Sequence, residues 1–337
     1  MEYIINLPDY WDKIDLKNNK NFRPSMASLW AFDANYGFLF GGLDENDIFN
    51  SFLYRYSFDE NIFTLAGELD IEPRGGGKMF YHDNKLYIVG GFFHDHSNKT
   101  YKTFPEIIIF DLLTRKKEKI YIRQINKVVQ SGICMDKENG YIYIYGGFNI
   151  AGSGKDSDMK NGFIKIDIEN NNIEPIRPDS REMERRAMMA CEVLPDGRVF
   201  IFSGFSQIKG KALCHNDYFI YDPVSNELQK HLCNEMVART GSKIFINSKK
   251  SHIVFYGGTY NGMETSGSFF IYDIRNRKFN FTMIHPLPGE IVEPALFYSS
   301  KLKKVYIIGG GNPVSELDYK ICDHIMILDL KKVKEKW

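Results

Sequence analysis

The 337-residue sequence is short of cysteine and has no excess of either charge, and each absence excludes a class of protein. Its five cysteines are scattered, odd in number and never spaced as CxxC, which argues against a disulfide framework and a zinc knuckle. Lysine plus arginine equals aspartate plus glutamate at 43 each. A neutral balance provides no global attraction to nucleic acid or to an anionic membrane, so neither is expected as a partner.

Long apolar runs are also missing. None approaches the roughly 20 residues that a membrane-spanning helix needs. The first residues, MEYIINLPDYWDK, lack the basic and apolar regions of a signal peptide. Together with unpaired cysteines, which suit a reducing compartment, these features predict a cytoplasmic protein.

Aromatic residues and an internal repeat are what the sequence does contain. Its 26 Phe and 20 Tyr favour β-strands. An apolar run that ends on two small residues occurs six times, and the second small residue recurs every 49 to 57 positions. These second residues are Gly42, Gly91, Gly147, Gly204, Gly258 and Gly310. In the fourth copy, VFIFSGF, Ser203 replaces the first glycine, and without a G-x-S-x-G pattern it marks a degenerate repeat rather than a nucleophile.

Two further columns repeat in register with the small-residue pair. An apolar run closing on aspartate follows each pair, at Asp59, Asp111, Asp167, Asp222, Asp273 and Asp329. A carboxylate in that place accepts backbone N–H groups of a turn, so these acids are expected to be structural. The other column precedes each pair by 16 to 18 residues, at Arg23, Arg74, Gln130, Arg186, Arg239 and Glu293.

Each repeat therefore predicts four antiparallel strands in about 50 residues, with a tight turn before the small-residue strand and a variable loop after it. Six such units stacked radially bury their sheet faces against one another. The predicted fold is all-β: a six-bladed β-propeller of four-stranded antiparallel blades, forming one domain over residues 1–337. The glycine pairs and the aromatic residues that follow them resemble the kelch-repeat family, whose superfamily includes the central domain of galactose oxidase.

The ends of the chain are expected to close the last blade. Residues Tyr3–Ile14 are predicted to supply its outer strand, with Trp11 as a packing anchor, because closure removes an exposed sheet edge. The alternative is closure by Val333–Trp337 alone.

Strand direction alternates within each blade. The long loops that follow the glycine pairs and the residues that precede each first strand are therefore expected at the same face of the propeller. The candidate partner-binding residues on that face are Arg23, Arg74, Gln130, Arg185, Arg186, Arg239 and Glu293. Guanidinium groups can bind carboxylates in a bidentate manner. The kelch resemblance implies binding of an acidic protein segment there. The alternative is that these arginines pair with acids inside the blades.

The predicted function is a non-catalytic protein–protein interaction module or adaptor, monomeric by itself. No catalytic residue, cofactor or metal is assigned. His94 and His96 could share one face of an extended segment, but no third ligand is visible nearby. The alternatives are a small-molecule enzyme of the kelch type, mutarotase- or specifier-like, with its site at the central mouth, and a scaffold subunit that binds through blade edges.

Overall fold

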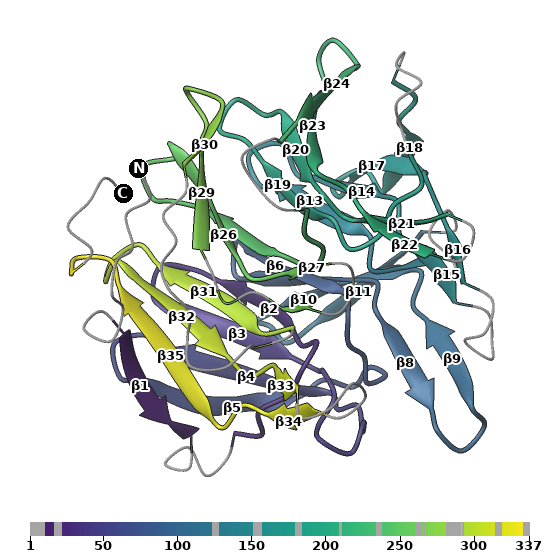
Figure 1. The fold of residues 1–337 in the computed structure, drawn as a ribbon. Helices are drawn as coiled ribbons and strands as arrows, with labels where there is room; N and C mark the ends of the chain where they lie inside the picture. Colours follow the sequence, from purple (N-terminus) through teal and green to yellow (C-terminus); the bar gives the residue numbers. More distant parts are fainter. Residues whose placement is uncertain are drawn as a thin grey trace. The chain divides into compact units, whose positions relative to one another are not determined.

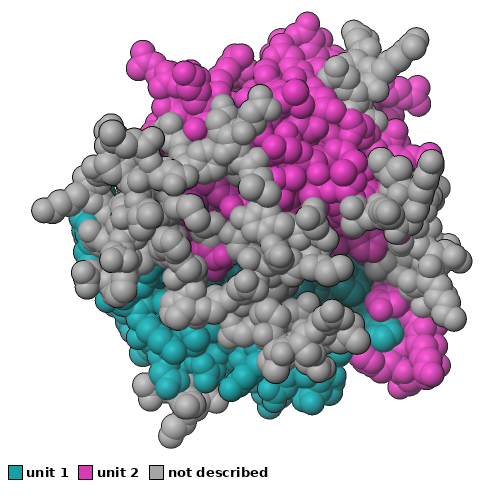
Figure 2. Space-filling model, viewed as in Figure 1, with its two compact units in different colours: residues 1–94, 107–119, 282–337 teal, residues 95–106, 120–281 magenta. Residues whose placement is uncertain are grey.

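The computed structural model describes residues 11–16, 22–122, 128–150, 157–178, 184–208, 211–233, 238–260, 264–265, 267, 269–280, 291, 293–313 and 319–332. Its regular elements are β-strands (Figure 1). Over these residues there is no helix with the length and apolar character of a membrane span. The chain divides into two compact units, unit 1 of residues 1–94, 107–119 and 282–337, and unit 2 of residues 95–106 and 120–281 (Figure 2).

Three four-stranded antiparallel sheets lie wholly or largely in unit 1, and each forms one blade. Blade A consists of β2 (Leu29–Phe32), β3 (Tyr36–Phe40), β4 (Phe52–Ser57) and β5 (Ile62–Glu68). Blade B consists of β6 (Lys78–His82), β7 (Lys85–Val89), β10 (Glu106–Asp111) and β11 (Lys117–Tyr121). Blade F consists of β31 (Ala295–Ser299), β32 (Lys304–Ile308), β35 (His324–Asp329) and β1 (Trp11–Asp15).

Unit 2 contains the other three blades, built in the same strand order. Blade C consists of β13 (Gly132–Asp136), β14 (Tyr141–Tyr145), β17 (Phe163–Asp167) and β18 (Asn172–Pro175). Blade D consists of β19 (Ala190–Val193), β20 (Val199–Phe202), β23 (Asp217–Asp222) and β24 (Glu227–Leu232). Blade E consists of β25 (Lys243–Ile246), β26 (His252–Tyr256), β29 (Phe269–Asp273) and β30 (Lys278–Asn280). The predicted fold class, a six-bladed β-propeller with four antiparallel strands in each blade, is confirmed.

The glycine-side loops are more ordered than the sequence predicts, because within the described residues five of the six carry short strands of their own. Four are two-stranded: β8 (Phe92–Asp95) with β9 (Thr100–Thr103), β21 (Phe205–Ile208) with β22 (Lys211–Cys214), β27 (Thr259–Tyr260) with β28 (Glu264–Thr265), and β33 (Gly311–Pro313) with β34 (Tyr319–Ile321). In the fifth, β12 (Val128–Val129), β15 (Phe148–Ile150) and β16 (Ser157–Met159) form a three-stranded sheet. We call the blade ends that carry the glycine pairs the glycine side, and the opposite ends the turn side.

Aromatic side chains fill the space between neighbouring blades within each unit. Between blades D and E, the rings of Phe202 and Phe255 lie 4.8 Å apart and those of Phe255 and Phe270 lie 4.7 Å apart. All three side chains are buried in one apolar cluster. Burial of such rings provides most of the favourable energy that holds flat sheets face to face, which accounts for the high aromatic content.

The N-terminal segment supplies the outer strand of blade F, as expected. β1 pairs antiparallel with β35, with Trp11 opposite Leu328 and Ile14 opposite Ile325. Residues Tyr3–Tyr10 of the predicted strand, and the alternative closing segment Val333–Trp337, lie outside the described residues.

Candidate functional site

Three of the predicted binding arginines point into their blades. Arg74 is 1 %, Arg186 0 % and Arg239 8 % exposed. In each case Nη1 donates to the carbonyl of the first residue of the small pair in the same blade. The distances are 3.3 Å to Gly90, 3.2 Å to Ser203 and 3.4 Å to Gly257. The same bond in three blades identifies this arginine as a brace between the segment before the first strand and the end of the second.

Arg186 also forms ion pairs with two carboxylates. Its guanidinium pairs with both oxygens of Asp217, and its Nη2 lies 2.9 Å from Glu184 Oε2. Its Cζ lies 4.7 Å from the ring centroid of Phe219, and Arg239 lies over the equivalent Phe270 at 4.8 Å. Burial opposes the charge, but Asp217 and Glu184 outweigh it and raise the pKa of Arg186. The interaction is structural.

The prediction that Arg74, Arg186 and Arg239 face a partner is therefore corrected, because buried guanidinium groups committed to a blade cannot contact one. Arg23 and Arg185 are exposed, and for them partner binding stays a prediction. Arg23 lies with its Cζ 5.9 Å from the ring centroid of Phe52.

Gln130 and Glu293 are half-buried, and the structure places them two positions later in the repeat than Arg74. Both have positive φ, 51° in each case, as do Ala27 at 55° and Met188 at 55°. These residues equate with Gly76 in blade B, which follows Arg74 by two positions. For Gln130 and Glu293 partner binding also stays a prediction, but the position itself is defined by backbone geometry.

The left-handed residues join neighbouring blades through backbone hydrogen bonds. In unit 1 the N–H of Gly76 donates to Ala27 O at 2.9 Å, and that of Ala27 donates to Glu293 O at 3.2 Å. In unit 2 the N–H of Met188 donates to Gln130 O at 2.8 Å, and that of Gly241 donates to Met188 O at 2.9 Å. The column holds Ala, Gly, Gln, Met and Glu, so residue type could not reveal it. The signal that could have done so is its fixed spacing after Arg74, Arg186 and Arg239.

Ser203 has the left-handed conformation of the glycine that it replaces, with φ of 55°. Its hydroxyl lies within hydrogen-bonding distance of the carbonyl of His215, at 2.7 Å, and of that of Arg239, and can donate to either. These bonds tie blade D to the start of blade E. The structure therefore supports the interpretation of Ser203 as a repeat position with a structural hydroxyl.

Close to Ser203, the glycine side of blade D carries a line of polar groups. Ser206 Oγ lies 2.8 Å from His215 Nε2, and His215 Nδ1 lies 3.3 Å from Glu184 Oε2. Serine, histidine and carboxylate thus follow one another as they do in the catalytic triad of a serine hydrolase. However, Ser206 is 7 % exposed, and the Glu184 carboxylate is shared with Arg186 and with Lys230, the latter at 2.7 Å. We interpret the line as a network that fixes β24 and the β21–β22 hairpin to the blade. Burial, with the charge of Arg186, lowers the pKa of His215.

Five of the six aspartates predicted to close the third strands form turns, whereas in blade A the strand ends at Ser57 and Asp59 pairs with Lys301 at 2.8 Å. Asp111 Oδ1 accepts the N–H groups of Leu113 at 2.9 Å and Thr114 at 2.7 Å. Comparable bonds are made by Asp167, Asp222, Asp273 and Asp329. The backbone hydrogen bond from Thr114 is the main reason that the pKa of Asp111 is lowered. Among the described residues, no group of three or more His, Cys, Asp or Glu side chains could hold a metal ion.

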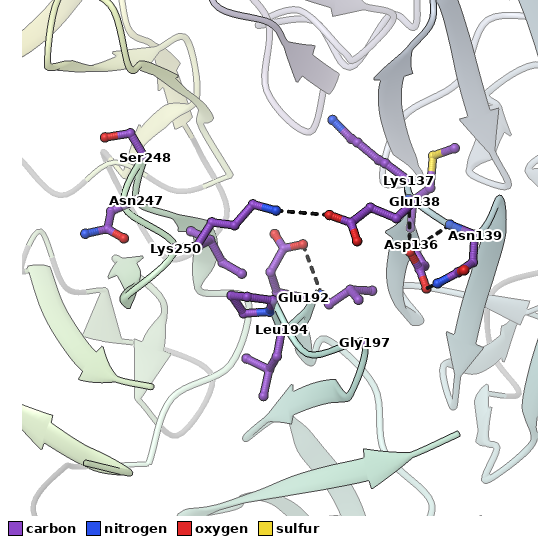
Figure 3. Close-up of a pocket in the computed structure, with 14 residues that line it drawn as sticks. Asp136, Lys137, Glu138, Asn139, Glu192, Leu194, Gly197, Asn247, Ser248 and Lys250 are labelled. Carbon is purple, nitrogen blue, oxygen red and sulfur yellow. Dashed lines mark hydrogen bonds and ion pairs between the residues drawn. The ribbon is translucent and has the colours of Figure 1, made fainter. Parts of the chain in front are cut away.

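A pocket of about 350 Å³ lies on the turn side of unit 2, where three turns meet (Figure 3). They are the β13–β14 turn with Glu138, the β19–β20 turn with Leu194, and the β25–β26 turn with Lys250. No feature noted in the sequence predicts this pocket. Its lining consists of Met135, Asp136, Lys137, Glu138, Asn139, Glu192, Val193, Leu194, Pro195, Gly197, Ile246, Asn247, Ser248 and Lys250.

Comparison with known protein families agrees with the repeat and the blades. A family model described as the KLHDC2/KLHL20/DRC7 Kelch-repeats domain matches residues 27–235. The chain belongs to the kelch-repeat family. The match begins before the first strand of blade A and ends just beyond β24, so it covers kelch blades A to D. A comparison with curated proteins gives no match.

Proposed function

We propose that this kelch chain is a non-catalytic interaction module that binds another protein on the glycine side of its blades. Kelch domains are in general protein-interaction modules. The observation that carries the proposal is that the glycine-side loops form short hairpins on a rigid blade scaffold. Recognition residues are typically found on such loops.

The described hairpins offer both apolar and charged contacts. Leu213 on β22 is 48 % exposed, which is high for a large apolar side chain in an ordered strand. Arg185, exposed at the same end of blade D, could pair with a carboxylate of the partner. With Arg74, Arg186 and Arg239 buried, an acidic partner segment would be met by Arg23 and Arg185 instead.

Affinity capture with matched variants tests the proposal. Leu213→Asp and Arg185→Glu should remove the same set of captured proteins. Val224→Asp should keep that set, because Val224 is 95 % exposed in the β23–β24 turn at the opposite end of the blade. Capture that is unchanged in Leu213→Asp and Arg185→Glu, or lost only in Val224→Asp, would contradict the proposal.

We also propose that the protein acts as a monomer in a reducing compartment, the cytoplasm. None of the five cysteines, all of which lie within the described residues, forms a disulfide, and Cys134, Cys191, Cys233 and Cys322 are buried. Within the described residues no observation favours the small-molecule enzyme, since the polar groups of blade D are engaged with one another.

A further inference from the structure

We propose that the turn-side pocket of unit 2 holds a lysine or arginine side chain of a partner protein, which replaces Lys250 as the ion-pair partner of Glu138. The inference rests on the proposed function in one respect, because both require that the chain binds another protein. The pocket is at the opposite end of the blades from the glycine-side hairpins, so the two surfaces can be tested separately.

The turns that form the pocket are held by their own side chains, so the pocket is preformed. Asp136 Oδ1 accepts the N–H groups of Glu138 at 3.1 Å and Asn139 at 3.2 Å. Asn247 Oδ1 accepts those of Ser251 at 2.9 Å and His252 at 3.1 Å. The carboxylate of Asp136 and the amide of Asn247 thus hold the turns in place. The carboxylates of Asp136, Glu138 and Glu192 and the ammonium groups of Lys137 and Lys250 set the charge of the pocket.

The size and walls of the pocket fit one long side chain. Its volume of about 350 Å³ is at the lower end of the range for ligand pockets, roughly 300–1,000 Å³. Val193, Leu194 and Ile246 provide apolar wall. The methylene stem of a lysine or arginine packs on such a surface while its charged end reaches a polar group.

The placement of charge favours a cation over an anion. Glu192, from strand β19, is half-buried, and Figure 3 shows it between the Lys250 turn and the Glu138 turn. Lys137 and Lys250 lie on the exposed rim, from which their long side chains can turn toward solvent. Glu192 Oε1 accepts the N–H of Val193 at 3.1 Å, which holds the carboxylate in the wall of the pocket. An incoming cation is therefore attracted by the carboxylates of Glu192 and Glu138, whereas an anion would be repelled by them.

The ion pair at the mouth is easily exchanged. Lys250 Nζ lies 3.0 Å from Glu138 Oε1 and joins blade E to blade C across blade D (Figure 3). Both side chains are largely exposed, at 62 % and 75 %. Such an exposed pair contributes little to stability. A partner's basic side chain can take the place of Lys250 at little cost and gains the burial of its stem.

The test is a titration of the full-length protein with N-acetyl-arginine amide, followed by NMR of the methyl groups of Val193, Leu194 and Ile246. We expect saturable shifts at these methyls, with a roughly millimolar Kd, as befits a single side chain. N-acetyl-glutamine amide, of similar size but neutral, should leave them unshifted. Equal shifts with both amides, or no saturable shift with arginine amide, would overturn the proposal.

Variants provide the sharper part of the test, because replacing the lysine and replacing either glutamate should change the affinity for arginine amide in opposite directions. Lys250→Ala should strengthen arginine amide binding by about threefold, since it removes the internal competitor, and Lys249→Ala in the same turn should not change it. Glu138→Gln and Glu192→Gln should each weaken binding by roughly threefold to tenfold. Glu138 is on the rim, so its variant serves even if Glu192→Gln fails to fold. Weaker binding in Lys250→Ala would contradict the exchange.

The outcome is independent of the glycine-side proposal. If arginine amide does not bind but Leu213→Asp still abolishes partner capture, only the pocket assignment fails. If arginine amide binds as described and partner capture is insensitive to Leu213→Asp and Arg185→Glu, the glycine-side proposal fails.

Discussion

At the scale of single residues, burial decides what an arginine does in this protein. Arg185 and Arg186 are neighbours in sequence, yet one is exposed and the other fully buried with Asp217 and Glu184. The sequence indicates that arginine recurs near the first strand of a blade, but it does not show which way each guanidinium points. For Arg186 that direction depends on the carbonyl of Ser203 and on the carboxylate of Asp217.

Replacing Arg186 by methionine should destabilise the protein by roughly 3–5 kcal/mol, because it leaves the carboxylates of Asp217 and Glu184 without their buried counter-charge. Urea unfolding measures the change. Arg185→Met is the matched control and should shift the free energy of unfolding by less than about 0.5 kcal/mol. Equal effects of the two substitutions would show that Arg186 is not a structural brace.

His215 should make the protein less stable in mild acid. Its pKa is lowered in the folded state by burial and by Arg186, with Lys230 adding to that effect, while Glu184 and Asp217 act in the opposite direction. The folded protein therefore binds a proton less readily than the unfolded chain, in which the pKa is about 6.5. Stability is complete above that value and falls as the pH decreases through it and on to the folded pKa.

The measurement is the free energy of unfolding of the wild type and of His215→Gln across this pH range. The wild type should lose more stability than the variant, which keeps a hydrogen-bonding side chain next to Ser206 but has no titrating group at this position. Parallel curves for the two proteins would contradict the assignment.

At the scale of elements, the sequence predicts strands wherever local chemistry marks their ends. Asp111 closes β10 through bonds to its own turn, and Gly42 ends its strand with a φ of 88°, so both columns can be identified by residue type. The hairpin β21–β22 could not be predicted, because its strands are short and form a separate two-stranded sheet outside the repeated blade. The pocket could not be predicted either, since it arises only where three separate turns meet.

Deleting residues 1–15 should lower the Tm by more than about 5 °C, because it removes the outer strand β1 of blade F and exposes the edge of β35. Ile325 and Leu328 on β35, which lie opposite Ile14 and Trp11, are fully buried in the intact protein. Thermal unfolding followed by circular dichroism measures the change. An unchanged Tm would contradict the role of β1 in completing the blade.

At the scale of the whole molecule, one repeated unit explains the fold and the structural use of the residues that recur. Three recurring features build the blades: the arginine brace, the turn aspartate and the left-handed residue before the first strand. What differs between blades is the glycine-side hairpin and, in unit 2, the side chains around the pocket. We therefore expect functional residues at the positions that differ between the six repeats.

The most direct test of the interaction module is cross-linking mass spectrometry of the protein with its captured partner, using an amine-reactive reagent. Lys102 on β9 and Lys320 on β34 are exposed on glycine-side hairpins, whereas Lys116 and Lys301 are exposed in turns at the other ends of their blades. The account predicts that cross-links to the partner form at Lys102 or Lys320. Cross-links confined to Lys116 and Lys301 would contradict it.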